Sequence, residues 1–421
     1  MKISSRRAFL KGTGATAGGA ALGGLVTTSR PAGAQEPLSA YEKKYIGQMG
    51  TEAPAVMHMS DATRSAEVGA VYANRHVPEF AAFTWNFEPS SDPMRFKEAI
   101  KPLSKADAAF LASTNTDGLI VIKGDTIVHE HYAKGMHPTT KHAVYSAGKS
   151  WTSAYFHKVL LPAMNKTVDE VLPEYKGSFY GSQTIRAVAD MRSPALFTED
   201  FTDPKALIFV AGSAAGWDFK LLDLEQNGFL TKMKKDAKYK QGDWHYVSAN
   251  TMVLGLLCAK LAGLHAYEAI RRFHQALGLE HISGTIANLH GQYSAEGGQY
   301  YTLRDFAKLP YAMANGGKIK NRTVLSNAYI EDVFSADGPK RAAWKASKYD
   351  AAYKVINWYS NQWYAVDKDI AVAVGSFGQF NVFNRKNKVV IAKFSTYPVG
   401  QDVKSAGRDL PWMIEKVKSS L

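Results

Sequence analysis

Strand-like patterns gather at the two ends of this 421-residue chain, and helical periodicity fills the middle. An early hairpin is predicted, with strands over 118–122 and 126–132 joined by the turn Lys123-Gly124-Asp125. Four more strand patterns come late in the sequence, at 362–366, 370–374, 380–383 and 389–394. Because a sheet must bury one face against another layer, this order favours one antiparallel sheet built from both ends of the chain.

Helices are expected to cover that sheet. One should span 146–162, Ser248 or Asn250 should cap another that ends at Gly263, and an amphipathic helix over 406–421 closes the chain. The predicted fold class is therefore α/β: an antiparallel sheet flanked by N- and C-terminal helices in an α/β/α sandwich, with a mostly helical domain inserted. The predicted divisions are a signal peptide, an N-terminal extension, a sandwich domain in two pieces and a helical domain, over 1–34, 35–105, 106–185 with 290–421, and 186–289.

The first 34 residues have the pattern of a bacterial export signal. Arg6-Arg7 begins a twin-arginine motif, a weakly apolar Gly/Ala-rich stretch follows over 12–26, and Ala32-Gly33-Ala34 is a cleavage site of the A-x-A type. The stretch is too short and too rich in glycine for a stable membrane span. We expect the twin-arginine machinery to export the folded protein to the periplasm, with cleavage after Ala34 and no integral span in the mature chain.

Charge and composition exclude several classes of site. Cleavage would remove five basic residues and no acidic one, lowering the formal net charge from +13 to +8. Part of that excess lies in 232–240, which has the composition of a solvated loop, and no aromatic platform or recognition helix suggests nucleic-acid binding.

Cys258 is the single cysteine, so there is no disulfide framework. His129 and His131 share a strand face but lack a third ligand, so no metal site is predicted.

Ser146 and Lys149 lie three residues apart where an extended run gives way to a helix. At this spacing two side chains are neighbours on one helix face. A desolvated lysine with a lowered pKa can take the proton of a serine hydroxyl, and free N–H groups at a helix start favour an oxyanion. The pair therefore indicates lysine-assisted acyl transfer, although the same spacing also occurs in ordinary capped helices.

Two later segments fit the same chemistry. Tyr246 can relay a proton if a neighbouring cation lowers its pKa, or it can simply pack. The stretch Gly375–Gln379 can bring a backbone N–H to the substrate and complete an oxyanion hole with the N–H of Ser146; the alternative is a glycine bulge without function. The adjacent acids Glu199 and Asp200 could indicate glycosidase chemistry, which uses a pair of carboxyl groups. Adjacent acids in such a loop are more often turn formers, and we interpret them so.

Taken together, these segments resemble the penicillin-recognising serine hydrolases. Within them, the chain is similar to the 6-aminohexanoate-dimer hydrolase branch related to class C β-lactamases and carboxylesterases. The resemblance covers 118–398 and rests on five segments in the same order: Ser146-Ala147-Gly148-Lys149, the acidic loop 199–204, 246–251, Gly297-Gly298, and Gly378-Gln379 with the strand end Phe394-Ser395-Thr396.

The resemblance implies an α/β sandwich with a helical domain and a covalent acyl-enzyme on Ser146. It also implies Lys149 and Tyr246 as the acid/base pair, the backbone N–H of Gln379 in the oxyanion hole with that of Ser146, and no metal or other cofactor. The candidates for substrate binding are Ser248, Asn250, Phe201 and Gly378.

Two departures from the family pattern narrow the expected substrate. Ser376-Phe377-Gly378 stands where β-lactamases and transpeptidases carry Lys-Thr-Gly, whose cation helps hold the antibiotic carboxylate. Phe201 stands where the nylon-oligomer enzymes usually have a tyrosine that can bind a substrate amide. The expected substrate is a short ester or amide, with an ester favoured. The alternatives are a β-lactamase or D-peptidase and, in another class, a catalytically silent binding protein.

Overall fold

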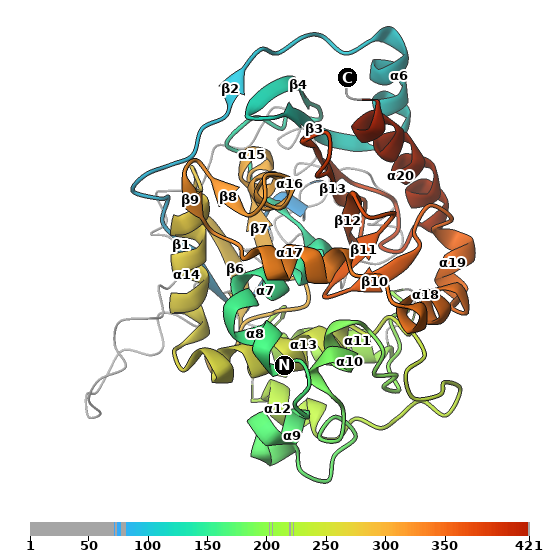
Figure 1. Cartoon of the computed structure of the whole chain (residues 1–421). Coiled ribbons are helices and arrows are strands. Elements are labelled where there is room, and N and C mark those ends of the chain that lie inside the picture. Colours follow the sequence, from blue (N-terminus) through green and yellow to red (C-terminus); the bar gives the residue numbers. More distant parts are fainter. Residues whose placement is uncertain are drawn as a thin grey trace, which may run out of the picture.

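The computed structural model describes residues 71, 74–76, 81–201, 203, 205–218, 220–221 and 223–419. The predicted twin-arginine signal and its cleavage site lie outside these residues. The centre of the fold is an eight-stranded sheet in the order β10-β11-β12-β13-β14-β3-β4-β2 (Figure 1). Its strands are β2 (Lys97–Glu98), β3 (Thr116–Lys123), β4 (Thr126–Tyr132), β10 (Trp358–Ser360), β11 (Trp363–Ala365), β12 (Ile370–Gly375), β13 (Gln379–Asn384) and β14 (Val389–Ser395).

The two ends of the chain meet where β14 pairs with β3. The pairing is antiparallel, with Val390 opposite Ile122 and Ala392 opposite Ile120. Every other neighbouring pair in this sheet is antiparallel except β2 with β4, which is parallel. The predicted antiparallel sheet built from both ends of the chain is therefore confirmed.

Helices from the two ends of the described chain cover the outer face of the sheet. Figure 1 shows α6 (Lys105–Ser113) beside α20 (Val403–Lys418). The rings of Phe110 and Trp412 stack between them at a centroid distance of 4.7 Å. Because successive residues of a strand point to opposite faces, Ile391 packs into this layer while its neighbour Ala392 packs into the opposite one.

The inner face is covered by helices that include the predicted Ser146 helix. That helix is not continuous: it opens as the 3-10 turn η2 (Tyr145–Ala147), continues as α7 (Gly148–Tyr155), breaks at Phe156 and resumes as α8 (His157–Ala163). The other helices of the described chain are α9 (Val168–Val171), η3 (Pro173–Tyr175), α10 (Ile185–Ala189), α11 (Leu207–Ala215), α12 (Gln226–Leu230), α13 (Ser248–Ala262), α14 (Ala266–Leu277), α15 (Leu303–Phe306), α16 (Lys308–Ala314), α17 (Asn327–Phe334), α18 (Gly338–Lys345) and α19 (Lys348–Ala352).

The start of α13 differs from the prediction. Its C-terminus is as expected, because Gly263 adopts a left-handed φ of +63° that glycine tolerates without strain. Its N-cap is Val247, however, and both Ser248 and Asn250 lie inside the helix. Good capping residues do not fix a helix start when other groups satisfy its first N–H donors.

A smaller sheet was not predicted. It has the order β1-β6-β7-β5, with strands β1 (Phe83–Phe87), β5 (His142–Ala143), β6 (Ser283–Ala287) and β7 (Gln299–Tyr301). A two-stranded ribbon joins β8 (Lys318–Ile319) to β9 (Arg322–Thr323). The stretch predicted as an N-terminal extension, 35–105, thus supplies β1 to this sheet and β2 to the large one. The predicted domain boundaries themselves stay a prediction.

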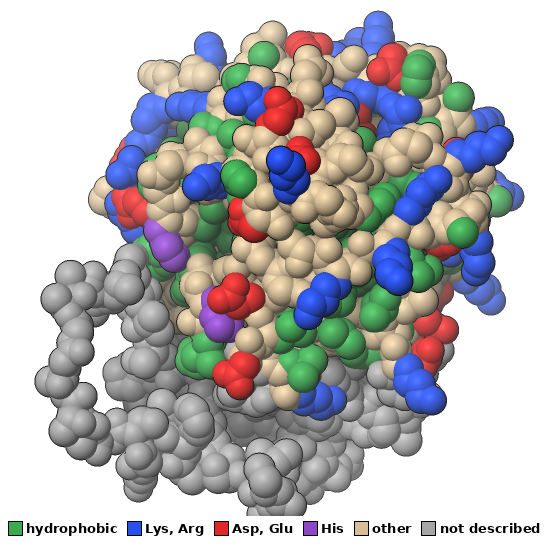
Figure 2. Space-filling view, turned by 90° about the horizontal axis from the view of Figure 1, so that it is seen from below, with side chains coloured by type: hydrophobic (Ala, Val, Ile, Leu, Met, Phe, Trp, Pro, Cys, Tyr) green, Lys and Arg blue, Asp and Glu red, His purple; other side chains and the backbone are tan. Residues whose placement is uncertain are grey.

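The structure was searched for basic surface patches, membrane-spanning helices and metal-binding clusters. On the face shown in Figure 2, Lys and Arg side chains lie singly or in small groups across the surface. Within the described ranges, no single helix has the length and apolar character to cross a membrane; α13 and α14 meet that test only together, across an 87° bend. No group of three or more His, Cys, Asp or Glu side chains among the described residues is arranged to hold a metal ion.

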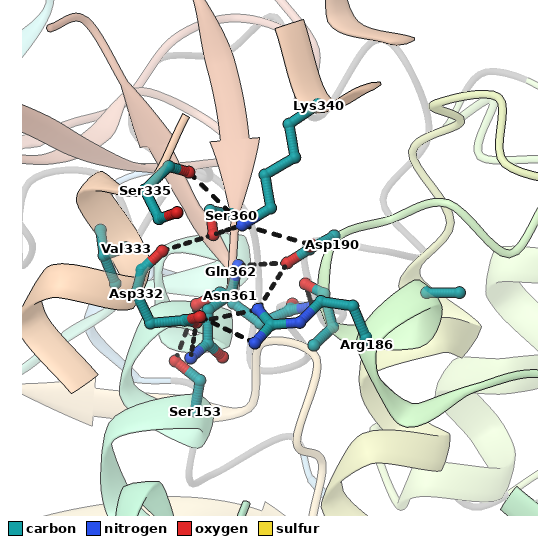
Figure 3. A network of polar contacts seen from close by, with 12 residues as sticks. Ser153, Arg186, Asp190, Asp332, Val333, Ser335, Lys340, Ser360, Asn361 and Gln362 are labelled. Carbon is teal, nitrogen blue, oxygen red and sulfur yellow. Dashed lines mark hydrogen bonds and ion pairs between the residues drawn. The ribbon is translucent and has the colours of Figure 1, made fainter. Parts of the chain in front are cut away.

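A buried polar network ties the helical region to the sheet (Figure 3). Asp190, which follows α10, accepts the backbone N–H of Asn361 at 2.8 Å and lies 3.7 Å from the ammonium of Lys340 on α18. Arg186 on α10 forms a 2.7 Å ion pair with Asp332 on α17. Burial raises the pKa of Asp190, so its charge depends on these neighbouring cations. The network therefore holds α10, α17, α18 and the β10–β11 turn together.

Lys340→Met should destabilise the protein by about 3 kcal/mol, because it leaves the buried Asp190 with one counter-charge fewer. The matched control is Lys345→Met on the same helix. Lys345 pairs with Asp350, but 76% of its side chain is exposed, so its loss should cost less than about 1 kcal/mol. Urea denaturation of the three proteins measures the difference. Equal unfolding free energies for the two variants would show that the network does not stabilise the fold.

Candidate active site

Ser146 is presented by a strained residue that precedes it. Tyr145 has a φ of +46°, a left-handed conformation that is rare for a side chain of its size. Its hydroxyl donates to Asn74 Oδ1 at 2.6 Å, and its ring stacks on Trp217 at 5.9 Å. Gly297 lies against the same turn, where a Cβ would approach Ser146 N to 3.3 Å. Packing on three sides thus holds the turn that exposes Ser146.

Lys149 contacts Ser146 as the sequence predicted. Its ammonium donates to Ser146 Oγ at 3.0 Å and to the backbone carbonyl of Glu296 at 2.7 Å. Only 2% of the Lys149 surface is exposed. Burial lowers the pKa of Lys149 to about 8, against the opposing charges of Glu199 and Glu296. A lysine with this pKa is neutral in a useful fraction near neutral pH and can accept a proton from Ser146.

Tyr246 completes the cluster but differs from the prediction in its acidity. Its phenol contacts the side chain of Ser146, and its ring centroid lies 5.2 Å from Lys149 Nζ. The sequence indicated a proton relay through Tyr246 on the condition that a neighbouring cation lowers its pKa. Burial raises the pKa well above 10 instead, and Glu199 adds to the rise. Tyr246 is therefore a neutral phenol, suited to donate or relay a proton rather than to act as a phenolate base.

Sequence reasoning missed two carboxyl groups beside this cluster. Glu199, interpreted as a turn former, lines the same cleft as Ser146, and its Oε1 accepts the backbone N–H of Ser248 at 2.5 Å. Glu296 accepts from Ser294 Oγ at 2.6 Å through its side chain. Burial raises the pKa of both carboxyls, and Lys149 opposes the rise. Glu199 belongs to the acidic loop 199–204, one of the five segments that resemble the family, and this resemblance was the sequence signal that could have indicated its place in the site.

The strand end expected to supply an oxyanion donor also differs in detail. Gly375–Gln379 forms the tight connection between β12 and β13, with Gly375 paired to Gln379. A Cβ on Gly375 would clash with the carbonyl oxygen of Val144, so this residue packs directly on the turn that holds Ser146. Ser376 lines the cleft with Ser146, whereas Gln379 is fully buried and turns its amide toward the carbonyl of Ser395 at 2.8 Å. Ser376 is therefore a further candidate for the backbone N–H of the oxyanion hole, and the role predicted for the N–H of Gln379 stays a prediction.

The cleft beside Ser146 has a volume of about 560 Å³ including its open mouth. Of the four predicted binding residues, Gly378 alone lines it. Gly378 lines the cleft, with a φ of +87° and the ring of Tyr397 against its backbone. Phe201 does not line the cleft but packs beside Gly400, which does.

Ser248 and Asn250 lie elsewhere. Ser248 holds Glu199, as described above. Asn250 is fully buried, where its amide bonds Tyr180 at 2.8 Å and the carbonyl of Ser193 at 3.1 Å, so it belongs to the helical core. Neither residue lines the cleft.

The chain is similar to known proteins over most of its length. It is 28% identical over 300 residues to a 6-aminohexanoate-dimer hydrolase of Paenarthrobacter ureafaciens, covering 68% of this chain and 74% of that protein. A structure from Bacillus anthracis, assigned as a 6-aminohexanoate-dimer hydrolase, superposes with a TM-score of 0.73 at 18% identity, covering 86% of this chain and 97% of the other. EstCE1, a hydrolase with promiscuous acyltransferase activity, superposes with a TM-score of 0.54 at 12% identity, covering 74% and 97%.

The two superpositions show the shared fold: an antiparallel sheet with helices on both sides. The model of the Beta-lactamase family matches residues 103–410, which include every strand of the large sheet except β2 and the cluster of Ser146, Lys149 and Tyr246. The chain therefore belongs to the Beta-lactamase family of hydrolases.

Proposed function

We propose that this protein is a serine hydrolase that cleaves short esters or amides through an acyl-enzyme on Ser146. The observation that carries the proposal is the 3.0 Å contact between Ser146 Oγ and the amine of Lys149, whose pKa burial lowers to about 8. A serine needs a base within hydrogen-bond reach, and the base works best when its pKa lies near the working pH.

The reaction starts when neutral Lys149 takes the hydroxyl proton of Ser146 and Oγ bonds to the substrate carbonyl carbon. The N–H groups of Ser146 and Ser376 stabilise the resulting oxyanion. When the bond to the leaving group breaks, Tyr246 donates its proton to that group and recovers one from Lys149. A water molecule then attacks the acyl-enzyme and gives a proton to Lys149. When the bond from Ser146 Oγ to the acyl carbon breaks, Lys149 returns this proton to Oγ, the acid is released, and the cycle closes.

An ester is the favoured substrate, because an alkoxide leaves with less help than an amine. The neutral phenol of Tyr246 nevertheless offers the proton that an amide nitrogen needs on departure. A β-lactamase or D-peptidase is the second candidate, since the fold is shared. Against it, the described residues that line the cleft include no Lys, Arg or His to hold a substrate carboxylate. Ser146-dependent labelling by a fluorescent penicillin would favour that candidate.

Ser146→Ala should abolish ester turnover, because it removes the attacking oxygen, and should leave the fold intact, because Ser146 is partly exposed at the cleft. Intact mass after treatment with a small fluorophosphonate should show one adduct on the wild type and none on the variant. The thermal midpoints of the two proteins provide the control for folding. Full activity of Ser146→Ala would refute the assignment, and an unreactive wild type would favour a silent binding protein.

The pH dependence of kcat/KM for a neutral ester should report Lys149. Because the neutral amine is the active form, the rate should rise with pH with a midpoint near the Lys149 pKa of about 8. Glu199→Gln removes a negative charge that raises this pKa, so the midpoint should move to lower pH. The control is Asp350→Asn, which removes a carboxyl group on α19 that does not line the cleft. This variant should leave the midpoint unchanged. A profile that does not move in Glu199→Gln would contradict the role of Lys149 as the base.

Gly375→Ala should lower kcat by about a hundredfold, the effect of losing one oxyanion donor. The added methyl group meets the backbone of Val144, so the Ser146 turn and the Ser376 N–H must separate. Gly338→Ala is the control, because a Cβ there has no neighbour within 4 Å. Steady-state kinetics with an activated ester measure both variants. Unchanged kcat in Gly375→Ala would remove Ser376 from the mechanism.

A further inference from the structure

A residue from outside the family-matched part of the chain contacts the Ser146 turn. Asn74 precedes residue 103, where the match to the Beta-lactamase model begins, and it is fully buried. Its Oδ1 accepts the hydroxyl of Tyr145 at 2.6 Å, and its Nδ2 donates to Thr396 Oγ1 at 3.1 Å. Tyr145 carries the left-handed φ of +46° directly before Ser146. Asn74 therefore holds the side chain of the strained residue that presents the nucleophile.

These bonds belong to one oriented chain that ends on a buried carboxylate. Thr396 Oγ1 donates to Asp117 Oδ2 at 2.5 Å. Because a carboxylate only accepts hydrogen bonds, the hydroxyl proton of Thr396 is committed to Asp117, and its oxygen is left to accept from Asn74. The Asn74 amide must then turn its NH₂ toward Thr396 and its oxygen toward Tyr145. The charge of Asp117 thus determines the orientation of the amide and makes the Tyr145 hydroxyl the donor.

Asp117, at the end of this chain, is held in its charged form. Burial alone would raise its pKa, but hydrogen bonding to His142 and the charges of Lys134 and Arg75 hold the pKa well below its usual range. Lys134 Nζ lies 3.2 Å from Asp117 Oδ1, and His142 Nε2 lies 3.4 Å from Oδ2. Arg75, the neighbour of Asn74, donates to the backbone carbonyl of Lys134 at 2.8 Å. The acceptor that orients the chain is therefore a permanent anion near neutral pH.

The same N-terminal segment also supports the ring of Tyr145. Ala82 donates its backbone N–H to the carbonyl of Gly216 at 2.9 Å, and β1, which follows Ala82, pairs with β6. Gly216 precedes Trp217, whose indole stacks on the Tyr145 ring at 5.9 Å. Residues from this segment thus contact Tyr145 directly through Asn74 and indirectly through Trp217.

The hydroxyl of Ser146 depends on this support. A left-handed φ is unfavourable for tyrosine and persists only while the surrounding structure holds it. Ser146 Oγ lies 3.0 Å from Lys149 Nζ, and relaxation of the preceding residue would move that oxygen. Because misplacement of a reacting group by about 1 Å can slow a reaction about a hundredfold, a small relaxation is enough to be measured.

We propose that Asn74 is a positioning residue for acyl transfer: its amide, oriented by Thr396 and Asp117, holds Tyr145 and so keeps Ser146 Oγ within reach of its base. The inference rests on the proposed hydrolase function. It gives the segment predicted as an N-terminal extension a part in the reaction, although no residue of that segment touches the reacting atoms.

The test separates how fast Ser146 reacts from how much of the protein can react. Intact mass, followed over time with a small fluorophosphonate, gives both the rate constant and the final labelled fraction. Asn74→Ala removes both bonds of the amide, and Tyr145→Phe removes one hydroxyl. Each variant should label as completely as the wild type, with a rate constant about tenfold lower or more. The double variant should be no slower than the slower single variant, because both changes break the same contact.

Tyr175→Phe is the matched control. The hydroxyl of this fully buried tyrosine donates to Asn227 Oδ1 at 2.9 Å, between η3 and α12, so its loss should leave the rate constant unchanged.

A wild-type rate constant in either single variant would overturn the inference, and Tyr145→Phe, which lacks only one oxygen atom, decides it alone if Asn74→Ala does not fold. A smaller labelled fraction at an unchanged rate constant would overturn it too, because Asn74 would then only stabilise the fold. Multiplied effects in the double variant would show that Asn74 does not act through Tyr145. A wild type without a Ser146-dependent adduct would instead overturn the proposed function.

Discussion

The contact between Lys149 and Ser146 depends on keeping a lysine out of water, and much of the surrounding structure serves that end. A buried ammonium is costly unless polar groups face it. Here the carbonyl of Glu296 accepts one hydrogen bond, and the carboxyls of Glu199 and Glu296 supply opposing charge. These partners stabilise the buried ammonium, but they do not fully offset the effect of desolvation. The Lys149 pKa of about 8 results from desolvation, which lowers it, and the two carboxyl charges, which raise it.

Close backbone packing places the other half of the site. Tyr145 is held in a left-handed conformation, Gly297 lies behind it, and Gly375 packs against the carbonyl of Val144. A side chain at either glycine would push the turn away from its neighbours. The strain at Tyr145 has a local cost of about 1–3 kcal/mol, and stacking on Trp217 with the bond to Asn74 offsets it. Residues far apart in sequence thus determine where one hydroxyl points.

The sequence predicted the large sheet well because its strands have clear patterns and end at strong turns. The hairpin at Lys123-Gly124-Asp125 and the four late strands are present, as is the final helix. The small sheet was missed because β5 and β7 have two and three residues, too few for a period to be recognised. In the site, Ser146, Lys149 and Tyr246 were predicted by motif. Glu199 and Ser376 were not assigned, because their positions in the cleft beside Ser146 arise from contacts between segments that no local pattern encodes.

The reacting pair Ser146 and Lys149 and most of the cleft lining come from different segments of the chain. Lys149 and Ser146 lie on one short helix and its leading turn, so their geometry follows from local sequence. The cleft wall is assembled from Tyr246, from Tyr349 and Tyr353 at α19, and from Asp402 at the start of α20. Those late segments can change in charge and shape without moving the nucleophile, because none of them supports the Ser146 turn. The geometry of the Ser146–Lys149 pair is therefore independent of the side chains that these late segments place around the cleft.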